Sequence, residues 1–481
     1  MRAVGRHGVL YAASEAYPFA KSGGLADVAY SLPKALAKSV DIAVVLPLYR
    51  SVDTERFGIT LIEASAVAFG GRDYPVELYG CVYDGVPCYF VYSPLLSERD
   101  HLYGPPGGAY EDNDLRFAIF CHGVVALAKR CGCGVLHLND WQTALCALLL
   151  HEMPELKIRT LFTVHNLAYQ GVFGAERLKR LGISKRHFTM EGVEFYGQIN
   201  LMKAAIGFSD RLTTVSAVYA GEILTERFGC GLEGYLRRHS AKLEGMLNGI
   251  DTDHFDPASD PALPMRYDSE NFTAKRKNKT DYAARVALAH SERPLLVMVS
   301  RMTWQKGIDL LLDALPRLLE QELNLAILGE GEARYLEPLS ALAAEHENLH
   351  VATGYDEGLS HRMYAAADFL LMPSRFEPCG LNQMIAMRYG TLPVVHAVGG
   401  LAESVHPFER FAADAKTGFG VTFAEETAEA LIDAVDRALR LYEAPERFGV
   451  ICRHNMHCDF SWHASAAAYL ACYRRLEEGG E

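Results

Sequence analysis

Short apolar runs alternate with longer stretches of helical periodicity along most of the chain. They form two blocks, and their members contain mainly Val, Ile and Leu, which is typical of parallel strands buried on both faces. Strand–helix alternation of this kind predicts an α/β protein with two doubly wound domains. The runs are Val9–Ala13, Ile42–Leu46, Val135–Asn139, Thr160–Val164 and Leu212–Val215, then Leu295–Val299, Leu325–Leu328, Phe369–Met372 and Leu392–Val395.

The stretch Asp256–Thr280 interrupts this pattern, because it carries several prolines and then the charged run Lys275–Lys279. We therefore expect a hinge near Gly249–Pro257. The last helix is predicted at Trp462–Glu477, where apolar residues recur at helical spacing. The expected division is an N-terminal domain at 1–250, a C-terminal domain at 251–460, and a final helix at 461–481.

Composition and charge narrow the class of protein. The chain has 481 residues, of which 49% are hydrophobic and 22% charged, the profile of a globular protein. No apolar run approaches the roughly 18 residues that span a bilayer, and no secretory segment is visible, so a cytoplasmic location is expected. The net charge of −13 argues against nucleic acid or an anionic membrane as partner.

The eleven cysteines are scattered, so we interpret them as reduced thiols. Cys452, His454, His457 and Cys458 lie close together in the sequence, but they lack the paired spacing of a zinc site. A late helix is the favoured interpretation of this segment and a zinc site the alternative. We expect no metal and no other cofactor in catalysis.

A glycine pair follows the first predicted strand. Lys21 precedes Gly23 and Gly24, which open a predicted helix. Adjacent glycines let a backbone approach an anion closely, helix N–H groups point at it, and Lys21 adds positive charge. The motif matches neither a dinucleotide fingerprint nor a Walker loop, and a tight strand-to-helix turn without a ligand is the alternative.

Two cations follow the first strand of the second block. Arg301 and Lys306 leave the end of Leu295–Val299, the edge where doubly wound sheets bind ligands. A guanidinium grips paired phosphate oxygens and an ammonium is a compact charge, so the pair suits a diphosphate leaving group. Two solvated surface cations are the alternative.

The segment Pro373–Gln383 follows the strand Phe369–Met372. Its Glu377 offers a carboxylate to sugar hydroxyls, and the helix start at Gly380–Asn382 could receive a phosphate. Gly399 and Gly400, after the next strand, repeat the glycine pair of the first block.

In the first block, Asp140 and His165 each follow a strand and could bind sugar hydroxyls. A histidine at a strand end more often has a structural role. A functional role for His165 is therefore supported only by the polar residues next to it in the sequence.

Taken together, these segments resemble glycosyltransferase family 5, the bacterial glycogen synthases and plant starch synthases, over nearly the whole length. The resemblance implies the GT-B fold, two Rossmann-like doubly wound domains facing a deep cleft, with the last helix crossing back to the first domain. The segments that carry it are Lys21–Val28, His137–Trp141, Thr163–Gly171, Asn248–Asp251, Ser300–Gly307, Pro373–Gln383 and Gly399–Leu401.

The resemblance also assigns roles. Arg301 and Lys306 would bind the donor phosphates, Glu377 would hold the glucose hydroxyls, and Asp140 and His165 would lie near the reacting carbon. Two departures, Val398 and Asn382 where the family often has Thr, lie near the expected phosphate. The remaining substrate-binding residues would be Lys21, Gly23, Gly24, Asn248, Cys379, Gly380, Leu381, Asn382, Gly399 and Gly400, with Tyr355 against the base.

The implied reaction is retaining transfer of glucose from ADP-glucose to the 4-hydroxyl end of an α-1,4-glucan. Two alternatives stay open: another GT-B retaining glycosyltransferase with a non-glucan acceptor, and a catalytically silent homologue. Ile385 stands where many related transferases carry a second Glu, which favours the glycogen synthase pattern. Adenine cannot be distinguished from uracil by the residues alone, and a covalent glucosyl intermediate is the rival of a same-face mechanism.

Overall fold

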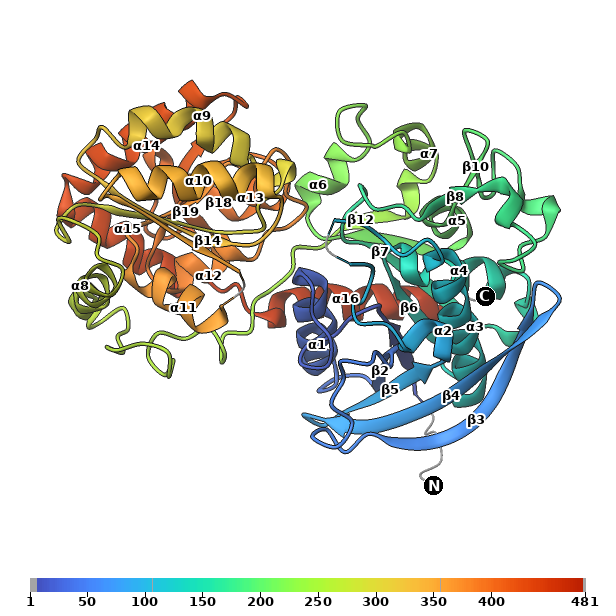
Figure 1. Cartoon of the computed structure of the whole chain (residues 1–481). Helices are drawn as coiled ribbons and strands as arrows, with labels where there is room; N and C mark the ends of the chain where they lie inside the picture. The colour runs from blue at the N-terminus through green and yellow to red at the C-terminus, as the bar shows by residue number, and fades with distance from the viewer. Residues whose placement is uncertain (1–6, 106, 355, 479–481) are drawn as a thin grey trace. The chain divides into compact units, whose positions relative to one another are not determined.

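Figure 1 shows the computed structural model, which describes residues 7–105, 107–354 and 356–478. The chain divides into two compact units. The first comprises Met1–Gly249 with Trp462–Glu481, and the second comprises Ile250–Ser461. Each unit is built around one large sheet, so the predicted α/β class with two doubly wound domains is confirmed.

The sheet of the first unit has nine strands in the order β12-β11-β7-β6-β1-β2-β5-β4-β3. The strands from β12 to β5 are parallel, and the five predicted runs are confirmed to within a residue or so at each end. These parallel strands are β1 (Val9–Ala12), β2 (Ile42–Pro47), β5 (Val86–Tyr92), β6 (Val135–Asn139), β7 (Arg159–Val164), β11 (Arg211–Thr214) and β12 (Leu243–Gly245).

The edge strand β12, the inner strand β5 and the opposite edge of this sheet were not predicted. The strands β3 (Thr60–Phe69) and β4 (Arg72–Tyr83) form a long antiparallel ribbon that extends the sheet beyond β5 (Figure 1). Much of β3 is exposed, so it lacks the continuous apolar run of a central strand. A separate small sheet contains β8 (Val172–Gly174), β10 (Gln198–Asn200) and β9 (Glu194–Phe195).

Helices cover both faces of the first sheet. Successive strand residues point to opposite faces, and both faces carry apolar side chains that need to be buried. Leu10 packs with α3 (Asn113–Cys131), α4 (Trp141–His151) and α5 (Leu201–Phe208) in one buried cluster. Tyr11 packs in another cluster with α1 (Gly24–Leu36) and α16 (Trp462–Glu478). Shorter helices of this unit are α2 (Pro94–Ser97), α6 (Ala217–Glu222) and α7 (Glu233–Arg238).

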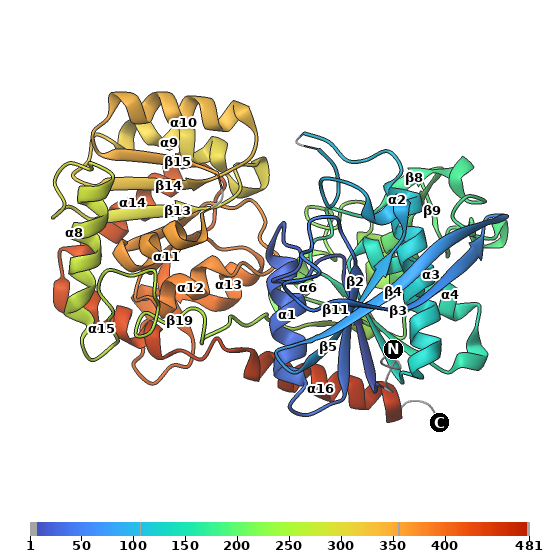
Figure 2. The same cartoon turned by 60° about the horizontal axis from the view of Figure 1, so that its bottom comes forward.

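The last helix, α16, is fixed to the first unit by polar as well as apolar contacts. It packs along α1, as Figure 2 shows. The hydroxyl of Tyr473 lies 2.7 Å from Nδ1 of His137 on β6, and Nε2 of His137 lies 2.7 Å from the hydroxyl of Thr163 on β7. His137 is the middle residue of β6. It is therefore a core residue that links the helix to the sheet.

The sheet of the second unit has seven parallel strands in the order β15-β14-β13-β16-β17-β19-β18. The four predicted runs are confirmed. The strands are β13 (Leu295–Val299), β14 (Asn324–Gly329), β15 (Leu349–Thr353), β16 (Phe369–Met372), β17 (Leu392–His396), β18 (Val405–Pro407) and β19 (Gly418–Phe423).

Helices also cover both faces of this sheet (Figure 1). One group packs over the cluster that holds Leu296 and Ile327, namely α9 (Ile308–Leu318), α10 (Ala333–Glu345), α14 (Ala428–Tyr442) and α15 (Pro445–His457). The others are α8 (Lys275–Arg285), α11 (Glu357–Ala366), α12 (Asn382–Arg388) and α13 (Gly399–Ser404).

The charged run Lys275–Lys279 forms the start of α8 and buries two of its lysines. The Lys275 ammonium donates hydrogen bonds to the carbonyls of Tyr364 and Ala365, each at 2.9 Å, and to the Thr391 hydroxyl at 2.8 Å. Burial lowers the pKa of Lys275 to about 7. This side chain joins α8 to α11 and to the start of β17.

We expect Lys275→Ala to lower the free energy of unfolding by at least about 2 kcal/mol, because three buried hydrogen bonds and the packing of the side chain are lost. Urea unfolding of the full chain, followed by circular dichroism, measures the change. Lys277→Ala, on the exposed side of the same helix, is the matched control and should change stability by about 0.5 kcal/mol or less. Equal effects of the two substitutions would contradict this role for Lys275.

Candidate active site

In the second unit, the predicted site residues gather at one edge of the sheet. β13, β16 and β17 are adjacent parallel strands, so their carboxyl ends meet there. Arg301 and Lys306 follow β13, Pro373–Gln383 follows β16, and Gly399 and Gly400 follow β17. This is the edge at which doubly wound sheets bind ligands.

An ion pair joins two of these segments. Nζ of Lys306 lies 2.5 Å from Oε2 of Glu377, and the Ser374 hydroxyl donates to the same oxygen at 3.0 Å. Glu377 is 6% exposed, so its charge is held by partners rather than by bulk water. Arg301 is exposed, and among the described residues it forms no ion pair. A buried carboxylate and the Lys306 cation are therefore in contact, and Arg301 belongs to the same loop as Lys306.

Close backbone contacts hold the loops in place. An added Cβ on Gly400 would lie 2.0 Å from the carbonyl oxygen of Cys379, so only glycine fits there. The amide of Gly400 donates to the carbonyl of Glu377 at 3.0 Å. The Asn382 side chain donates to the Val299 carbonyl at 2.6 Å, which ties the start of α12 to the end of β13. Cys379, Gly380 and Leu381 lie between these anchors.

In the first unit, the predicted residues follow parallel strands of one sheet, so they lie beyond the same ends of those strands. Gly23 caps α1 and Gly24 is its first residue, at the end of the loop that follows β1. Lys21 donates to Asp27 at 2.8 Å across the same turn. Asn248 follows β12 and is buried, and its Oδ1 has no hydrogen-bond partner among the residues described. An unpaired buried acceptor is rare and suits a ligand hydroxyl.

Asp140 and His165 contact each other at the ends of β6 and β7. One oxygen of Asp140 accepts the backbone amides of His165 at 2.8 Å and of Asn166 at 3.4 Å. Burial nevertheless raises the pKa of Asp140 to about 7. Its φ of 55° is unusual for a residue other than glycine, and strain of this kind clusters at functional sites.

His165 is a neutral ring at pH 7, since burial lowers its pKa to about 3. Its Nε2 lies 2.8 Å from Oδ1 of Asn139, which also accepts the Tyr11 hydroxyl at 3.0 Å. Nε2 must therefore carry the proton, and Nδ1 keeps a lone pair that can accept a hydrogen bond from a hydroxyl.

Sequence reasoning missed Glu15, which lies beneath the glycine loop. It is 3% exposed, and its Oε2 accepts the backbone amide of Ser22 at 2.5 Å. Burial raises the pKa of Glu15 to about 7, and the nearby Asp27 and Asp140 charges act in the same direction. A charged residue next to the apolar run Val9–Ala13 was the available signal.

The Glu15 shift predicts a pH effect on stability. A carboxyl whose pKa rises from 4.5 to about 7 on folding favours the folded state below pH 4.5, and this contribution is lost as the pH rises through 7. Glu15→Gln removes the ionisable group and with it this loss of stability. We therefore expect the change in the free energy of unfolding caused by Glu15→Gln to be more favourable at pH 8 than at pH 4, by about 1–3 kcal/mol. Urea unfolding at both pH values tests this, and an equal effect at the two would contradict it.

Comparisons with known proteins match both units. Residues 8–238 match the family model described as starch synthase catalytic domain, and residues 282–453 match glycosyl transferases group 1. A glycogen synthase of Geobacter sulfurreducens is 43% identical over 97% of this chain and 98% of its own length. One from Anaeromyxobacter dehalogenans is 44% identical over 98% of this chain and 99% of its own.

The chain belongs to the glycogen and starch synthase family.

A solved relative agrees with this membership. The catalytic domain of starch synthase IV from Arabidopsis thaliana, bound to ADP and acarbose, superposes with a TM-score of 0.91 at 33% identity. The match covers 98% of this chain and 100% of that one. The GT-B fold predicted from the resemblance is thereby confirmed, and the chain is a glucosyltransferase. Tyr355, predicted to pack against the base, lies outside the described residues.

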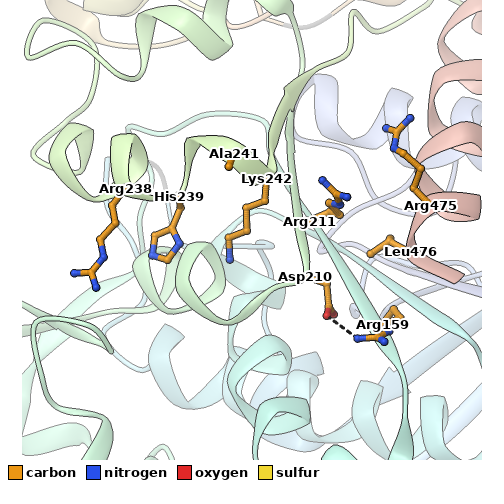
Figure 3. A pocket seen from close by; sticks show the side chains of 9 residues that line it. All are labelled: Arg159, Asp210, Arg211, Arg238, His239, Ala241, Lys242, Arg475 and Leu476. Carbon is orange, nitrogen blue, oxygen red and sulfur yellow. Dashed lines mark hydrogen bonds and ion pairs between the residues drawn. The ribbon is translucent and has the colours of Figure 1, made fainter. Parts of the chain in front are cut away.

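The first unit also contains a pocket of about 390 Å³, away from the candidate site residues (Figure 3). Arg159 and Arg211 begin β7 and β11, so the pocket sits at the amino ends of strands whose carboxyl ends carry the candidate site. Two of its cations form ion pairs: Arg159 pairs with Asp210 at 3.3 Å, and Arg475 with Glu244 at 2.7 Å. The pocket is therefore distinct from the candidate donor site.

Two metal-like sequence patterns are not metal sites in the described structure. His346 to His350 reads H-E-x-x-H, but α10 ends at Glu345 and His350 belongs to β15. The two histidines therefore do not share a helix face. Cys452, His454, His457 and Cys458 lie on or next to α15, and no three of them bring metal-binding atoms together within the described ranges. No described helix is long and apolar enough to cross a membrane.

Proposed function

We propose that this glucosyltransferase moves glucose from ADP-glucose to the 4-hydroxyl at the non-reducing end of an α-1,4-glucan, with retention of configuration. The contact between Lys306 and Glu377 carries this proposal. It places a cation for a departing phosphate beside a buried carboxylate that can accept sugar hydroxyls. Relatives named glycogen synthase and a starch synthase bound to ADP and acarbose support the donor and acceptor.

The second unit would hold the donor and stabilise its leaving group. Negative charge develops on the diphosphate as its bond to glucose carbon 1 breaks. Lys306 is held at the sheet edge by Glu377, and Arg301 follows the same strand. Preorganised charge of this kind is the largest single contribution to many catalysed reactions. Backbone amides near Gly380–Asn382 would bind phosphate oxygens, and Gly399 and Gly400 would let the next loop approach the donor closely.

Glu377 would exchange its contact with Lys306 for sugar hydroxyls when the donor binds. The Ser374 hydroxyl, at 3.0 Å, keeps the carboxylate oriented meanwhile. Tyr355 would pack against the base.

The first unit would act on the same donor and on the reacting carbon. Lys21, Gly23 and Gly24 would contact the donor, and Asn248 would offer its unpaired Oδ1 to a sugar hydroxyl. Asp140 would face the positive charge that builds on the sugar, and Nδ1 of His165 would accept a hydroxyl.

A same-face mechanism fits these groups best. The acceptor 4-hydroxyl bonds to carbon 1 from the side on which the carbon–oxygen bond to the diphosphate breaks. Its proton passes to the departing phosphate oxygen. Asp140 suits charge stabilisation more than nucleophilic attack, because its Oδ1 already accepts two backbone amides. Trapping of a glucosyl–Asp140 adduct would instead establish the covalent route.

We also place the reaction in the cytoplasm. The side chains of Cys131 and Cys133 are within hydrogen-bond reach of each other but form no disulfide, which fits a reducing compartment.

Initial rates with ADP-glucose and UDP-glucose, each with glycogen as acceptor, test the donor assignment. We expect ADP-glucose to give the higher kcat/KM. A higher value with UDP-glucose would contradict the assignment of the base. Transfer to a non-glucan acceptor at an equal or higher rate would replace the acceptor assignment by the alternative glycosyltransferase.

A further inference from the structure

Three potential metal ligands meet in the second unit. His254, Glu357 and His361 each bring one ring nitrogen or carboxylate oxygen to within 4.8 Å of the others. Glu357 and His361 stand four residues apart on α11, so they lie on one face of the helix. His254 comes from the turn that follows Asp251, four residues after the start of the unit at Ile250.

The best-defined of the three ligands is His361, which is 4% exposed. Its Nδ1 lies 2.7 Å from Oδ2 of Asp260, and this oxygen also accepts the Tyr389 hydroxyl at 2.6 Å. The carboxylate therefore holds the proton on Nδ1 and leaves a lone pair on Nε2. A carboxylate that orients an imidazole in this way is the usual second partner of a metal-bound histidine.

Nε2 of His361 is buried and has no hydrogen-bond partner among the described residues. Leaving a buried nitrogen unpaired costs about 1–3 kcal/mol, so such atoms need an explanation. The contact between His254 and Glu357, with Nε2 and Oε1 3.3 Å apart, could be a plain ion pair at the end of α11. An ion pair does not account for Nε2 of His361, whereas a shared metal ion accounts for both.

The ligand types select the metal. Two imidazoles and one carboxylate are a common protein set for Zn²⁺, whereas Mg²⁺ and Ca²⁺ prefer oxygen ligands alone. Two ligands about 2.1 Å from a tetrahedral ion lie roughly 3.4 Å apart, close to the separation of His254 and Glu357.

We propose that His254, Glu357 and His361 bind one zinc-like divalent ion, with Asp260 orienting His361 and water completing the tetrahedron. The ion would connect the turn that opens the second unit to α11 and stabilise that connection. It takes no part in glucosyl transfer.

The full chain, freed of metal with a chelator, can be titrated with Co²⁺ and with Zn²⁺. Cobalt is read by its visible absorption, and zinc by competition with a chromophoric chelator. We expect one equivalent of either ion to bind the wild type, with the cobalt spectrum of a tetrahedral nitrogen–oxygen site. Zinc should also raise the melting temperature.

His254→Gln and Glu357→Gln are the informative variants. Their side chains are 41% and 38% exposed, so both proteins should fold, which equal melting temperatures in chelator would verify. Each should lose the stoichiometric site, and Asp260→Asn should weaken it by about 10–100-fold. His457→Gln, exposed on α15, is the matched control and should bind like the wild type. A wild type that binds no more tightly than His254→Gln, or a His457→Gln protein that loses the site, would overturn the proposal.

Discussion

Lys306→Ala is expected to lower kcat for glucose transfer by about 10²–10³, because the leaving diphosphate loses a fixed positive charge in the transition state. The substitution also leaves Glu377, which is 6% exposed, without the cation that lies 2.5 Å from it. Steady-state rates with saturating donor and glycogen measure the loss. Arg301→Ala should have an effect of similar size through the same phosphates.

The control for this prediction is Lys416→Ala, which removes an exposed lysine of the same unit. It should leave kcat within about twofold, since surface charges far from the reacting atoms are screened by salt. If Lys306→Ala raised only KM and kept kcat, the lysine would contribute to ground-state binding alone. That result would contradict its role at the leaving group.

Asp140→Asn is expected to lower kcat by about 10² or more and to change its pH dependence. Because burial raises the pKa of Asp140 to about 7, the wild-type rate should increase as the pH rises through 7 and the carboxyl ionises. Its negative charge then stabilises the positive sugar. The Asn variant keeps an oxygen for the amides of His165 and Asn166 but cannot ionise.

Glu15→Gln separates the two carboxyls that titrate near pH 7, since interacting groups share their apparent pKa values. This variant should retain the increase in rate across pH 7, whereas Asp140→Asn should give a flat profile. The assignment would be wrong if Asp140→Asn kept the increase and Glu15→Gln abolished it. A pH series of kcat for the three proteins decides this.

Much of the architecture could be predicted because its central strands are buried on both faces. Runs such as Leu295–Val299 and Ile42–Pro47 carry an unambiguous apolar signal. Parallel strands place their carboxyl ends at one edge, so the order of motifs along the chain also predicted which residues would meet. Lys306 and Glu377, 71 residues apart, are in contact for this reason.

Other features depend on tertiary contacts that leave little trace in the sequence. The ribbon of β3 and β4 is exposed or half-buried over most of its length, so its strands lack a continuous apolar run. Lys275 appears in a charged run, yet it is buried because acceptors from distant segments surround it. His254 and His361 are 107 positions apart, and only the packing of α11 brings them together. Glu15 was not predicted as a site residue. Its only signal in the sequence was a charge beside an apolar strand, and the neighbouring glycine motif was the stronger indication of a ligand site.

The most direct test of glucan synthesis is transfer of labelled glucose from ADP-glucose or UDP-glucose to glycogen, followed by digestion with an amylase specific for α-1,4 bonds. We predict that the wild-type protein incorporates label and that the amylase releases it as short oligosaccharides. Folded protein that incorporates no label from either donor, or label that resists the amylase, would contradict the account.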